Sequence, residues 1–467
     1  MKNNSARPKL FRVHFAAVIL LCSAIAIHAQ TNFQRLKSFG VPTTSGIKPI
    51  SELLAGTDGM LYGVTYSGGS NNVGIVYSVA KNGANFSALH HFTGGMFPAG
   101  GLVQGSDGIL YGTTQTGGSN NCGTIYSLRT NGVGFKILHD FNSKNSEGVF
   151  PCGSLLLAAD GGLYGITSSG GSNNCGTVFR FGSGDGDYKI LHQFVGTDGS
   201  NPFASLRLGK NGMLYGTTQN GGSNDCGTIF QLDTNGENYF VLHHFAGGDN
   251  DGRMPLGSVA VGTNNALYGV TYYGGTNDSG TIFEADTNGN YQLLHCFNGS
   301  SDGNHPWAGL TSATEGTFYG TTRFGGSNDM GTIFRLDITT SHYVLLHQFC
   351  GRDGNQPQAN LLFASDETLF GTTTFGGDGS LGVIFKLFSG PANIKISNAR
   401  RRSDGIFLEF DGGSFGQNFV IEATTNLDSP DEWQSLGVMS ADADGTFQFL
   451  DTQASNFPAR FYRCQMP

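Results

Sequence analysis

The sequence predicts an all-β protein, a seven-bladed β-propeller followed by a small fibronectin- or immunoglobulin-like β-sandwich. The 467 residues include 73 glycines, and each interior glycine costs a helix roughly 1 kcal/mol relative to alanine, so long helices are disfavoured. Charged residues make up only 13% and aromatic residues 12% of the chain, a composition typical of a folded protein and not of a disordered one. One tripeptide recurs at a regular interval up to about residue 390 and then stops.

The chain begins with the pattern of a secretory signal peptide. Residues 2–12 carry four basic side chains and no acid, and an apolar run from Phe15 to Ile27 ends close to Ala29. This run is shorter than the roughly 20 apolar residues that a membrane-spanning helix needs. We therefore expect a signal peptide over residues 1–29, no transmembrane segment, and a mature protein that is periplasmic, on the cell surface or extracellular.

Charge and cysteine content limit the possible partners. The formal net charge is −9, and loss of the basic signal peptide makes it more negative, which disfavours nucleic acid as a partner. Seven cysteines remain in the mature chain without a CxxC pair, so no dense disulfide framework is expected and their pairing stays open. Cys122, Cys175 and Cys226 occupy a repeated position that other copies fill with Val, Ser, Met or Leu, which indicates packing and not metal binding.

A repeat of about 51 residues organises the chain from its mature start to residue 390. The tripeptide Leu-Tyr-Gly, or a close variant of it, begins at seven positions: Leu61, Leu110, Leu163, Leu214, Leu267, Phe318 and Leu369. A proline precedes each of these by about 12 residues: Pro49, Pro98, Pro151, Pro202, Pro255, Pro306 and Pro357. Two independent markers thus define the same seven copies.

Turn signals divide each copy into four short strands. In the second copy the segments 102–104, 109–114, 124–128 and 135–141 are separated by Asp107-Gly108, the glycine-rich residues 117–121 and Asn131-Gly132. Asp-Gly and Asn-Gly favour the tight turns of hairpins, and the segments are rich in β-branched and aromatic residues. Each copy is therefore predicted to be a four-stranded antiparallel meander.

The two ends of the repeat region predict how the copies are arranged. The last copy lacks its fourth strand after residue 387, whereas residues 33–39 match that missing strand, as comparison with residues 188–194 shows. We expect the N-terminal strand to complete the seventh blade, so that residues 30–391 form a closed propeller; this closure removes two exposed sheet edges and ties the termini together. An open solenoid is the alternative, but it would need polar caps that the sequence does not contain.

The repeat consensus LYGTT..GG.NN.GTIF.L...G....LH.F resembles the Gloeo/Verruco (GloVer) tandem repeat of exported bacterial proteins, the choice-of-anchor type. The resemblance covers about residues 33–390 in seven copies. It implies export and display. It supplies no activity and no catalytic residues to transfer to this chain.

The residues after the repeats have a different character. Residues 392–467 contain no Leu-Tyr-Gly and alternate apolar with polar side chains at 406–410 and 419–423. About six short strands separated by Asp-Gly and proline turns predict a small β-sandwich. The segment from Val420 to Arg463 resembles a module at the ends of many exported bacterial proteins, and we interpret it as an accessory or attachment domain.

Six histidines occupy one position of the predicted fourth strand: His90, His139, His192, His243, His295 and His347. The fourth strand of a blade is normally the outermost, so equivalent histidines on different blades cannot converge on one metal. We interpret them as structural, with a threonine of the second strand such as Thr114 or Thr218 as the expected partner.

Hairpin parity places the glycine-rich loop and the connection between copies at the same end of the ring, which we predict to be the recognition surface. The candidate ligand-binding residues on it include a repeated set, namely Asn121, Asn174, Asp225, Asp278 and Asp329. Asn and Asp also stabilise turns, so a purely structural role is the alternative for this set. The remaining candidates are Asp251, Arg253, Asp302, His305, Trp307, Arg352 and Asp353, among which Trp and Arg are the usual anchors of binding sites.

The sequence thus predicts an exported, non-catalytic binding or display scaffold, monomeric, with glycan and protein ligands equally open. The first alternative is a propeller glycoside hydrolase or lyase with acidic residues at the recognition surface, and the second is a structural envelope component. No HExxH, Walker or Rossmann pattern is present, and the GxSxG match at Gly412–Gly416 falls between predicted strands. No cofactor is expected. Calcium stays open because the surface is acidic and the loops are rich in oxygen ligands, although no complete ligand set is present and Asp442 and Asp444 form only half of a calcium loop.

Overall fold

A computed structural model describes residues 32–40, 42–182, 186–262, 265–313, 316–364, 368–388, 395–411, 418–425, 433–440, 446–457 and 460–465. The chain divides into two compact units, one comprising Gln34–Gly390 and the other including Pro391–Pro467. Helix is nearly absent. Within the ranges described it is limited to α1 (Pro42–Ser45) and the 3-10 turns η1 (Ser143–Asn145) and η3 (Ala454–Asn456).

Each copy of the repeat forms one antiparallel sheet in the described part of the first unit. Sheet 1 consists of β2 (Leu54–Ala55), β3 (Met60–Thr65), β4 (Ile75–Ala80) and β5 (Ser87–His91). Sheet 2 consists of β6 (Val103–Gln104), β7 (Ile109–Thr114), β8 (Thr124–Arg129) and β9 (Lys136–Asp140). Sheet 3 consists of β10 (Gly148–Leu157), β11 (Gly162–Gly170), β12 (Thr177–Gly182) and β13 (Tyr188–Gln193).

Sheet 4 begins with β14 (Ser200–Pro202) and β15 (Arg207–Leu208), which both pair with β16 (Met213–Asn220), and continues with β17 (Thr228–Asp233) and β18 (Phe240–His244). Sheet 5 consists of β20 (Ala260–Val261), β21 (Leu267–Thr271), β23 (Thr281–Ala285) and β24 (Tyr291–Cys296). The short strands β19 (Gly252–Arg253) and β22 (Tyr273–Gly274) pair beside it. Sheet 6 consists of β25 (Thr311–Ser312), β26 (Thr317–Thr322), β27 (Thr332–Asp337) and β28 (His342–Gln348).

Sheet 7 combines the two ends of the repeat region. It contains β29 (Leu362–Phe363), β30 (Thr368–Thr373) and β31 (Val383–Phe388) from the last copy, and β1 (Asn32–Ser38) pairs with β31 as its fourth strand. The backbone N–H of Phe39 continues this pairing by donating to the carbonyl of Gly382 (3.0 Å). Arg35 on β1 also forms an ion pair with Asp378 (2.8 Å).

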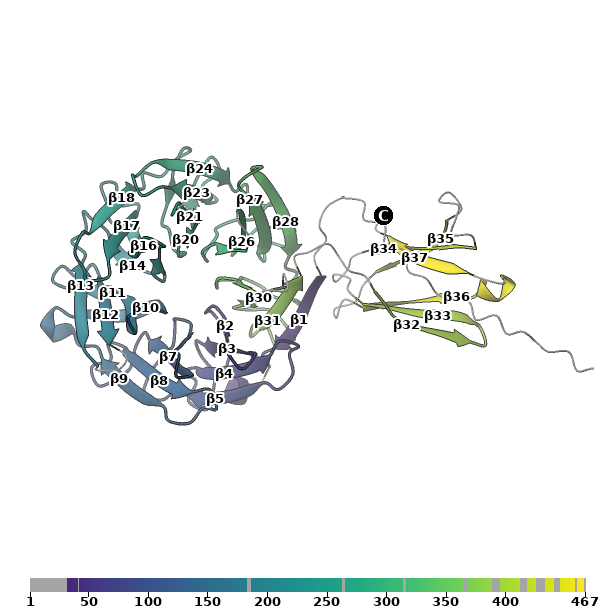
Figure 1. Ribbon diagram of the computed structural model, residues 1–467, viewed down its shortest axis with the longest axis horizontal. Helices are drawn as coiled ribbons and strands as arrows, with labels where there is room; N and C mark the ends of the chain where they lie inside the picture. Colours follow the sequence, from purple (N-terminus) through teal and green to yellow (C-terminus); the bar gives the residue numbers. More distant parts are fainter. Residues whose placement is uncertain are drawn as a thin grey trace, which may run out of the picture. The chain divides into compact units, whose positions relative to one another are not determined.

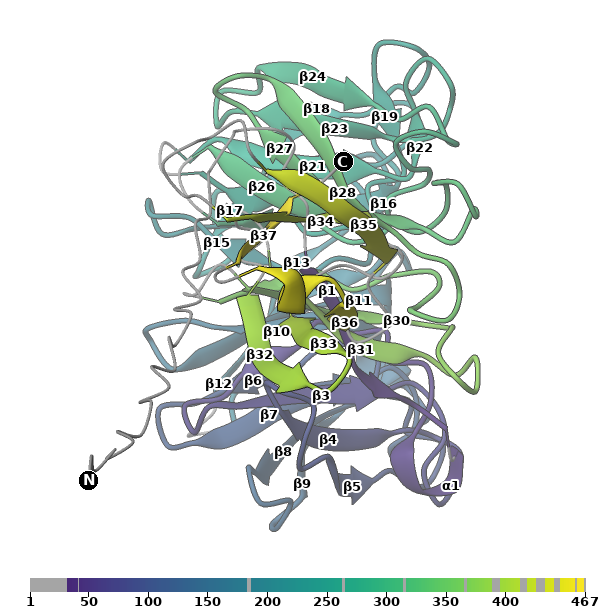
Figure 2. The same cartoon turned by 90° about the vertical axis from the view of Figure 1, so that its right-hand side faces the viewer.

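The sheets of the first unit follow one another around a ring, with the first strand of each sheet toward the centre and the fourth at the periphery (Figure 1). Figure 2 shows the same strands from the side. The predicted all-β class and the predicted four-stranded antiparallel meander are both confirmed. Strand boundaries agree closely with the turn signals, as in the pairing of β7 with β8 across the glycine-rich loop.

The hydrophobic core lies between neighbouring sheets. Val178 of β12, Phe194 and Phe230 of β17 belong to one buried cluster that joins sheets 3 and 4. A cluster of the same kind joins sheet 7 to sheet 1 and contains Phe39 and Ile75. The glycine of the repeated tripeptide is required by this packing. A Cβ atom at Gly165, for example, would lie only 2.4 Å from Cζ of the Phe179 ring.

The second unit contains two three-stranded sheets. One consists of β32 (Lys395–Arg402), β33 (Gly405–Asp411) and β36 (Thr446–Asp451), and the other of β34 (Asn418–Thr424), β35 (Gln434–Ser440) and β37 (Phe461–Gln465). Both sheets contribute to one buried cluster, with Leu408 and Phe447 from the first and Phe419 and Ile421 from the second.

Candidate functional site

The repeated histidines bind carboxylates at the periphery of the ring. In sheet 3, His192 Nε2 lies 2.9 Å from Oδ2 of Asp198, whose other oxygen accepts the backbone N–H of Val195 (2.8 Å). The imidazole stacks on Tyr239 of sheet 4, with 3.7 Å between the ring centroids. The Tyr239 hydroxyl donates to the backbone carbonyl of Asp198 (2.8 Å). We call this arrangement of histidine, acid and aromatic ring a rim clamp, because it joins the outer edges of two neighbouring sheets.

Rim clamps recur around the ring with small variations. Four further histidine–acid pairs occupy equivalent positions: His139–Glu147, His243–Asp251, His295–Asp302 and His347–Asp353. Burial raises the pKa of Asp353, but hydrogen bonding and charge attraction from His347 outweigh burial and lower it overall. The Asp251, Asp302 and Asp353 carboxylates therefore lie against histidines, and ligand binding by them stays a prediction.

The expected threonine partner of the histidines was wrong. Thr114 and Thr218 instead share hydrogen bonds with Thr124 and Thr228 of the adjacent third strands, at 2.8 Å in both cases. The reason is the strand order, since the third strand lies between the second strand and the histidine-bearing fourth strand. The acid that takes the role of partner comes from the connection to the next copy.

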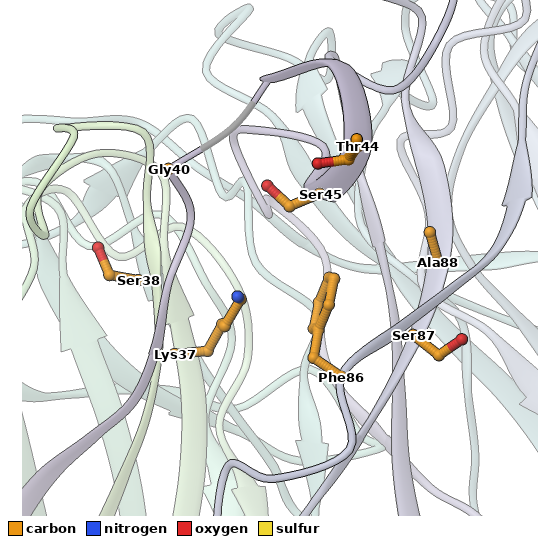
Figure 3. A pocket seen from close by; sticks show the side chains of 8 residues that line it. All are labelled: Lys37, Ser38, Gly40, Thr44, Ser45, Phe86, Ser87 and Ala88. Carbon is orange, nitrogen blue, oxygen red and sulfur yellow. The ribbon is translucent and has the colours of Figure 1, made fainter.

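Two copies lack the acid. His90 stacks on Phe135 (3.8 Å between centroids), and burial, followed by the nearby His91, lowers the pKa of His90 to about 4. At the closing sheet Lys37 replaces the histidine, and its Nζ lies 4.6 Å from the centroid of the Phe86 ring. A hollow of about 460 Å³ lies beside Lys37 between β1, α1 and β5, and its lining includes Ser45 and Ser87 (Figure 3).

The repeated Asn and Asp candidates stabilise the glycine-rich loops. Asn121 has a φ of 54°, and its Oδ1 accepts the backbone N–H of Gly117 (3.0 Å). Equivalent bonds to a glycine N–H are made by Asn174, Asp225, Asp278 and Asp329, each with a positive φ. Short polar side chains tolerate this left-handed conformation better than other residues do. These contacts agree with the structural alternative for this set, and ligand binding by it stays untested.

A pocket of about 120 Å³ lies at the centre of the ring. All seven copies contribute to it with the residues that follow the repeated proline, among them Glu52, Ser154, Ser258, Trp307 and Asn360. We call it the central pocket. Because these positions are equivalent in the repeat, the pocket lining can be compared copy by copy.

The copies differ in chemistry at this pocket. The third residue after the proline is serine or glycine in five copies, whereas Glu52 and Asn360 occupy it in the first and last. Asn360 Nδ2 donates to Glu52 Oε2 (3.1 Å) and to Ser258 Oγ (3.0 Å). Arg207 Nη2 also donates to Glu52 Oε2 (3.4 Å) and to Ser258 Oγ (3.1 Å). This network fixes a carboxylate, an amide and a guanidinium around the centre of the ring.

Trp307 lines the pocket, and aromatic and basic side chains surround it. Phe203, also in the lining, and Tyr272 meet the Trp307 ring edge to face, at 6.0 and 5.7 Å between centroids. The guanidinium carbon of Arg323 lies 4.8 Å from the Trp307 ring centroid. Burial raises the pKa of Tyr272, and the nearby Arg323 opposes this effect.

The other candidates from the sequence are divided between the pocket surroundings and more distant positions. His305 stacks on Tyr272 (4.6 Å between centroids), next to Trp307. Arg253 pairs with Asp278 (2.7 Å) and lies over Tyr273. Arg352 is exposed, and its backbone carbonyl accepts a hydrogen bond from Arg35. The structure thus places Trp307 in the lining of the central pocket and His305 beside Tyr272, which contacts Trp307.

Sequence reasoning missed Glu52, Arg207, Arg323 and Asn360. The available signal was departure from the repeat. Arg323 follows the second strand at a position that holds Tyr, Gln, Ser or Thr in the other copies, and Arg207 stands where others have Leu, Val, Ala or Thr.

A family model built for the Gloeobacter/Verrucomicrobia repeat matches residues 25–157 and 150–385. The chain belongs to this repeat family. The match extends from before β1 into β31, so it covers nearly all of the repeat region. No curated protein matches the chain.

Several solved structures share part of the fold. Oligogalacturonate lyase from Vibrio parahaemolyticus is 12% identical with a TM-score of 0.49 and covers 77% of this chain and 97% of its own. The extracellular domain of a putative one-component system from B. thetaiotaomicron is also 12% identical with a TM-score of 0.49, covering 91% and 54%. A fungal alcohol oxidase of the AA5 family is 14% identical with a TM-score of 0.48, covering 92% of each chain. Likenesses at this level carry no functional argument.

Some expectations concern parts of the chain that the structure does not describe. Residues 1–29, the GxSxG match at 412–416 and the half calcium loop at 442–445 all lie outside the described residues. Among those that are described, no cluster of three or more His, Cys, Asp or Glu side chains could hold a metal ion. No helix in the same residues is long and apolar enough to span a membrane.

Proposed function

We propose that this chain is an exported, non-catalytic binding protein, a closed seven-bladed β-propeller whose central pocket binds a glycan at the loop-rich face. The fibronectin- or immunoglobulin-like C-terminal sandwich serves attachment. One observation carries the proposal. Five of the seven copies form the same histidine–acid pair at the rim. At the central pocket, by contrast, Glu52 and Asn360 stand where the other copies have serine or glycine, and Trp307 is the single tryptophan among the described lining residues.

The chemistry of these replacements suits a sugar. The apolar C–H face of a pyranose ring packs on an aromatic ring such as Trp307, while its hydroxyls pair with planar polar groups such as the Asn360 amide and the Glu52 carboxylate. Ligand sites commonly combine an apolar wall with a few fixed polar groups in this way. The volume of about 120 Å³ is small, so the pocket fits one ring or a chain end and not an enclosed oligosaccharide.

The pocket lining favours binding over hydrolysis. Glycoside hydrolases of the usual mechanism place two carboxyl groups about 5–10 Å apart on either side of the scissile bond. Glu52 is the single acid among the described residues that line the central pocket, and it already accepts hydrogen bonds from Asn360 and Arg207. Three of the acids predicted at the loop-rich face, Asp251, Asp302 and Asp353, bind histidines at the rim.

The test uses the purified protein from residue 30 onward on a glycan array, followed by calorimetry with the best ligand. Trp307→Ala is expected to lower affinity at least 10-fold, about 1.4 kcal/mol. Tyr66→Ala is the matched control, because Tyr66 packs against Phe97 (5.2 Å between ring centroids) at the repeat positions of Tyr272 and His305, and it does not line the pocket. Equal losses in the two variants, or no glycan bound by the parent protein, would contradict the proposal. Release of reducing ends would favour the enzyme alternative.

A second measurement exploits the tryptophan content. The chain has two tryptophans, so Trp433→Phe leaves Trp307 as the single indole fluorophore. Its emission should change on ligand addition with the Kd found by calorimetry. Unchanged emission at saturating ligand would mean that the ligand binds elsewhere.

A further inference from the structure

The Arg323 guanidinium, which contacts the pocket residue Trp307, has no acidic partner among the residues that the structure describes. It lies over Trp307 and over Phe324, at 4.8 and 5.0 Å from the ring centroids. Its Nε and Nη2 donate to the neutral Oε1 of Gln356, at 3.4 and 3.3 Å. Across the described residues, no carboxylate comes within ion-pairing distance of Arg323.

A second stacked arginine in the neighbouring copy provides an internal comparison. Arg253 lies 4.2 Å from the centroid of the Tyr273 ring, much as Arg323 lies over Trp307. However, Arg253 binds Asp278 through both Nε (3.3 Å) and Nη2 (2.7 Å). The fold thus satisfies one of these guanidinium groups with its own carboxylate and leaves the other able to bind an external anion.

The charges around the pocket also indicate the Arg323 guanidinium as the group that would bind an anion. The Arg207 cation is matched by Glu52, which Arg207 contacts directly. Among the described residues around the central pocket, Arg323, which lies over the lining residue Trp307, is therefore a cation without a carboxylate partner. The protein as a whole is acidic, with a net charge of −9, so general electrostatic attraction would not draw an anion to this face. Binding of an anionic ligand would depend on Arg323 itself.

We propose that the central pocket selects a glycan that bears a carboxylate, as in a uronic acid. The sugar ring contacts Trp307, and the carboxylate pairs with the guanidinium that lies over the same indole. This inference rests on the proposed glycan-binding function and names its ligand class. The planar guanidinium, which can donate two parallel N–H bonds to a carboxylate, makes the charge and shape of that group the basis of selection.

The experiment compares an oligouronate with its methyl ester, which has the same sugar chain without the charges. Calorimetry on the parent protein should show the free acid binding at least 10-fold more tightly than the ester. Arg323→Gln should remove that preference by weakening the acid at least 10-fold while leaving the ester unchanged. Arg253→Gln, the matched control, should leave both affinities unchanged. Trp307→Ala should weaken both.

The outcomes separate this inference from the function on which it rests. Equal affinity for acid and ester in the parent protein would overturn the acidic-glycan inference and leave glycan binding intact. No binding of either form, with an empty glycan array, would overturn the proposed function. Tighter Arg323-dependent binding of poly-glutamate than of the oligouronate would show that the site serves acidic peptides and would also overturn the inference. The comparison of acid with ester needs no variant, so it stands even if Arg323→Gln fails to fold.

Discussion

The rim and the centre of the ring are built from the same repeat, but most copies carry the same side chains at the rim and different side chains at the centre. At the rim, five copies pair a histidine with an acid, and in four of them the imidazole stacks on a tyrosine of the neighbouring sheet. At the central pocket the equivalent residues change from serine or glycine to glutamate or asparagine, and a tryptophan enters. Repetition marks the positions that hold the fold together, and departure from repetition marks the positions that are free to bind.

The largest effect is expected at the seam between sheets 7 and 1. Phe39 is fully buried and contacts Tyr77 and Phe86 of sheet 1 at 5.7 and 5.8 Å between centroids. Phe39→Ala should therefore lower the free energy of unfolding by about 3–5 kcal/mol, measured by urea denaturation. Phe194→Ala, at an equivalent and equally buried position, should cost a similar amount. A much smaller cost at Phe39 would mean that β1 does not close the ring in solution.

A smaller effect is expected from breaking one rim clamp. Asp353 is buried and binds His347 (2.9 Å) and the Cys350 N–H (2.8 Å). Asp353→Asn should therefore cost about 1.5–3 kcal/mol of stability and leave glycan affinity unchanged. Asp378→Asn is the control, because Asp378 pairs with Arg35 while 73% exposed and should cost less than about 1 kcal/mol. A loss of ligand binding by folded Asp353→Asn would assign function to the rim.

The copy without an acid should show its own pH dependence. Burial lowers the pKa of His90 to about 4, whereas an unfolded histidine titrates near 6.5. The unfolded chain therefore binds more protons between these values, so the His90 contribution is complete above about pH 6.5 and declines toward pH 4. Because His90 is only half-buried, solvent screening reduces its contribution to the free energy of unfolding to about 1–2 kcal/mol.

Denaturation of the parent protein and of His90→Gln from pH 7 to pH 4 measures this contribution. The difference in stability between the two proteins should shrink as the pH falls. A difference independent of pH would contradict the neutral form of His90, as would an NMR titration midpoint near 6.5.

The smallest effect is expected at the glycine-rich loops. Asn121→Gly keeps the left-handed conformation and loses one hydrogen bond to Gly117, so it should cost about 1 kcal/mol or less. Ligand affinity should not change. If binding fell while thermal stability stayed constant, the loop residues proposed from the sequence would belong to the recognition surface after all.

The fold could be predicted from the sequence because the same turn residues recur seven times at a nearly fixed spacing. The pairing of the rim acids with the histidines was not predicted, because the acids lie in connections of variable length. Asp198 follows His192 by six residues, whereas Glu147 follows His139 by eight, so no fixed interval links the two groups. The differences at Glu52 and Asn360 were visible in the aligned copies. The contact between these two side chains could not be predicted, because it depends on the inner strands meeting at the centre of the ring.

The pairing of β1 with β31 also determines when, during synthesis of the chain, the ring can close. Arg35 and Asp378 are 343 residues apart in sequence, so the strand that the ribosome makes early has no partner until nearly the entire repeat array exists. Until then β1 is a strand without a partner, which other chains could join. Completion of the protein, and with it the assembly of a pocket that draws on every copy, is therefore a single late event and not a gradual one.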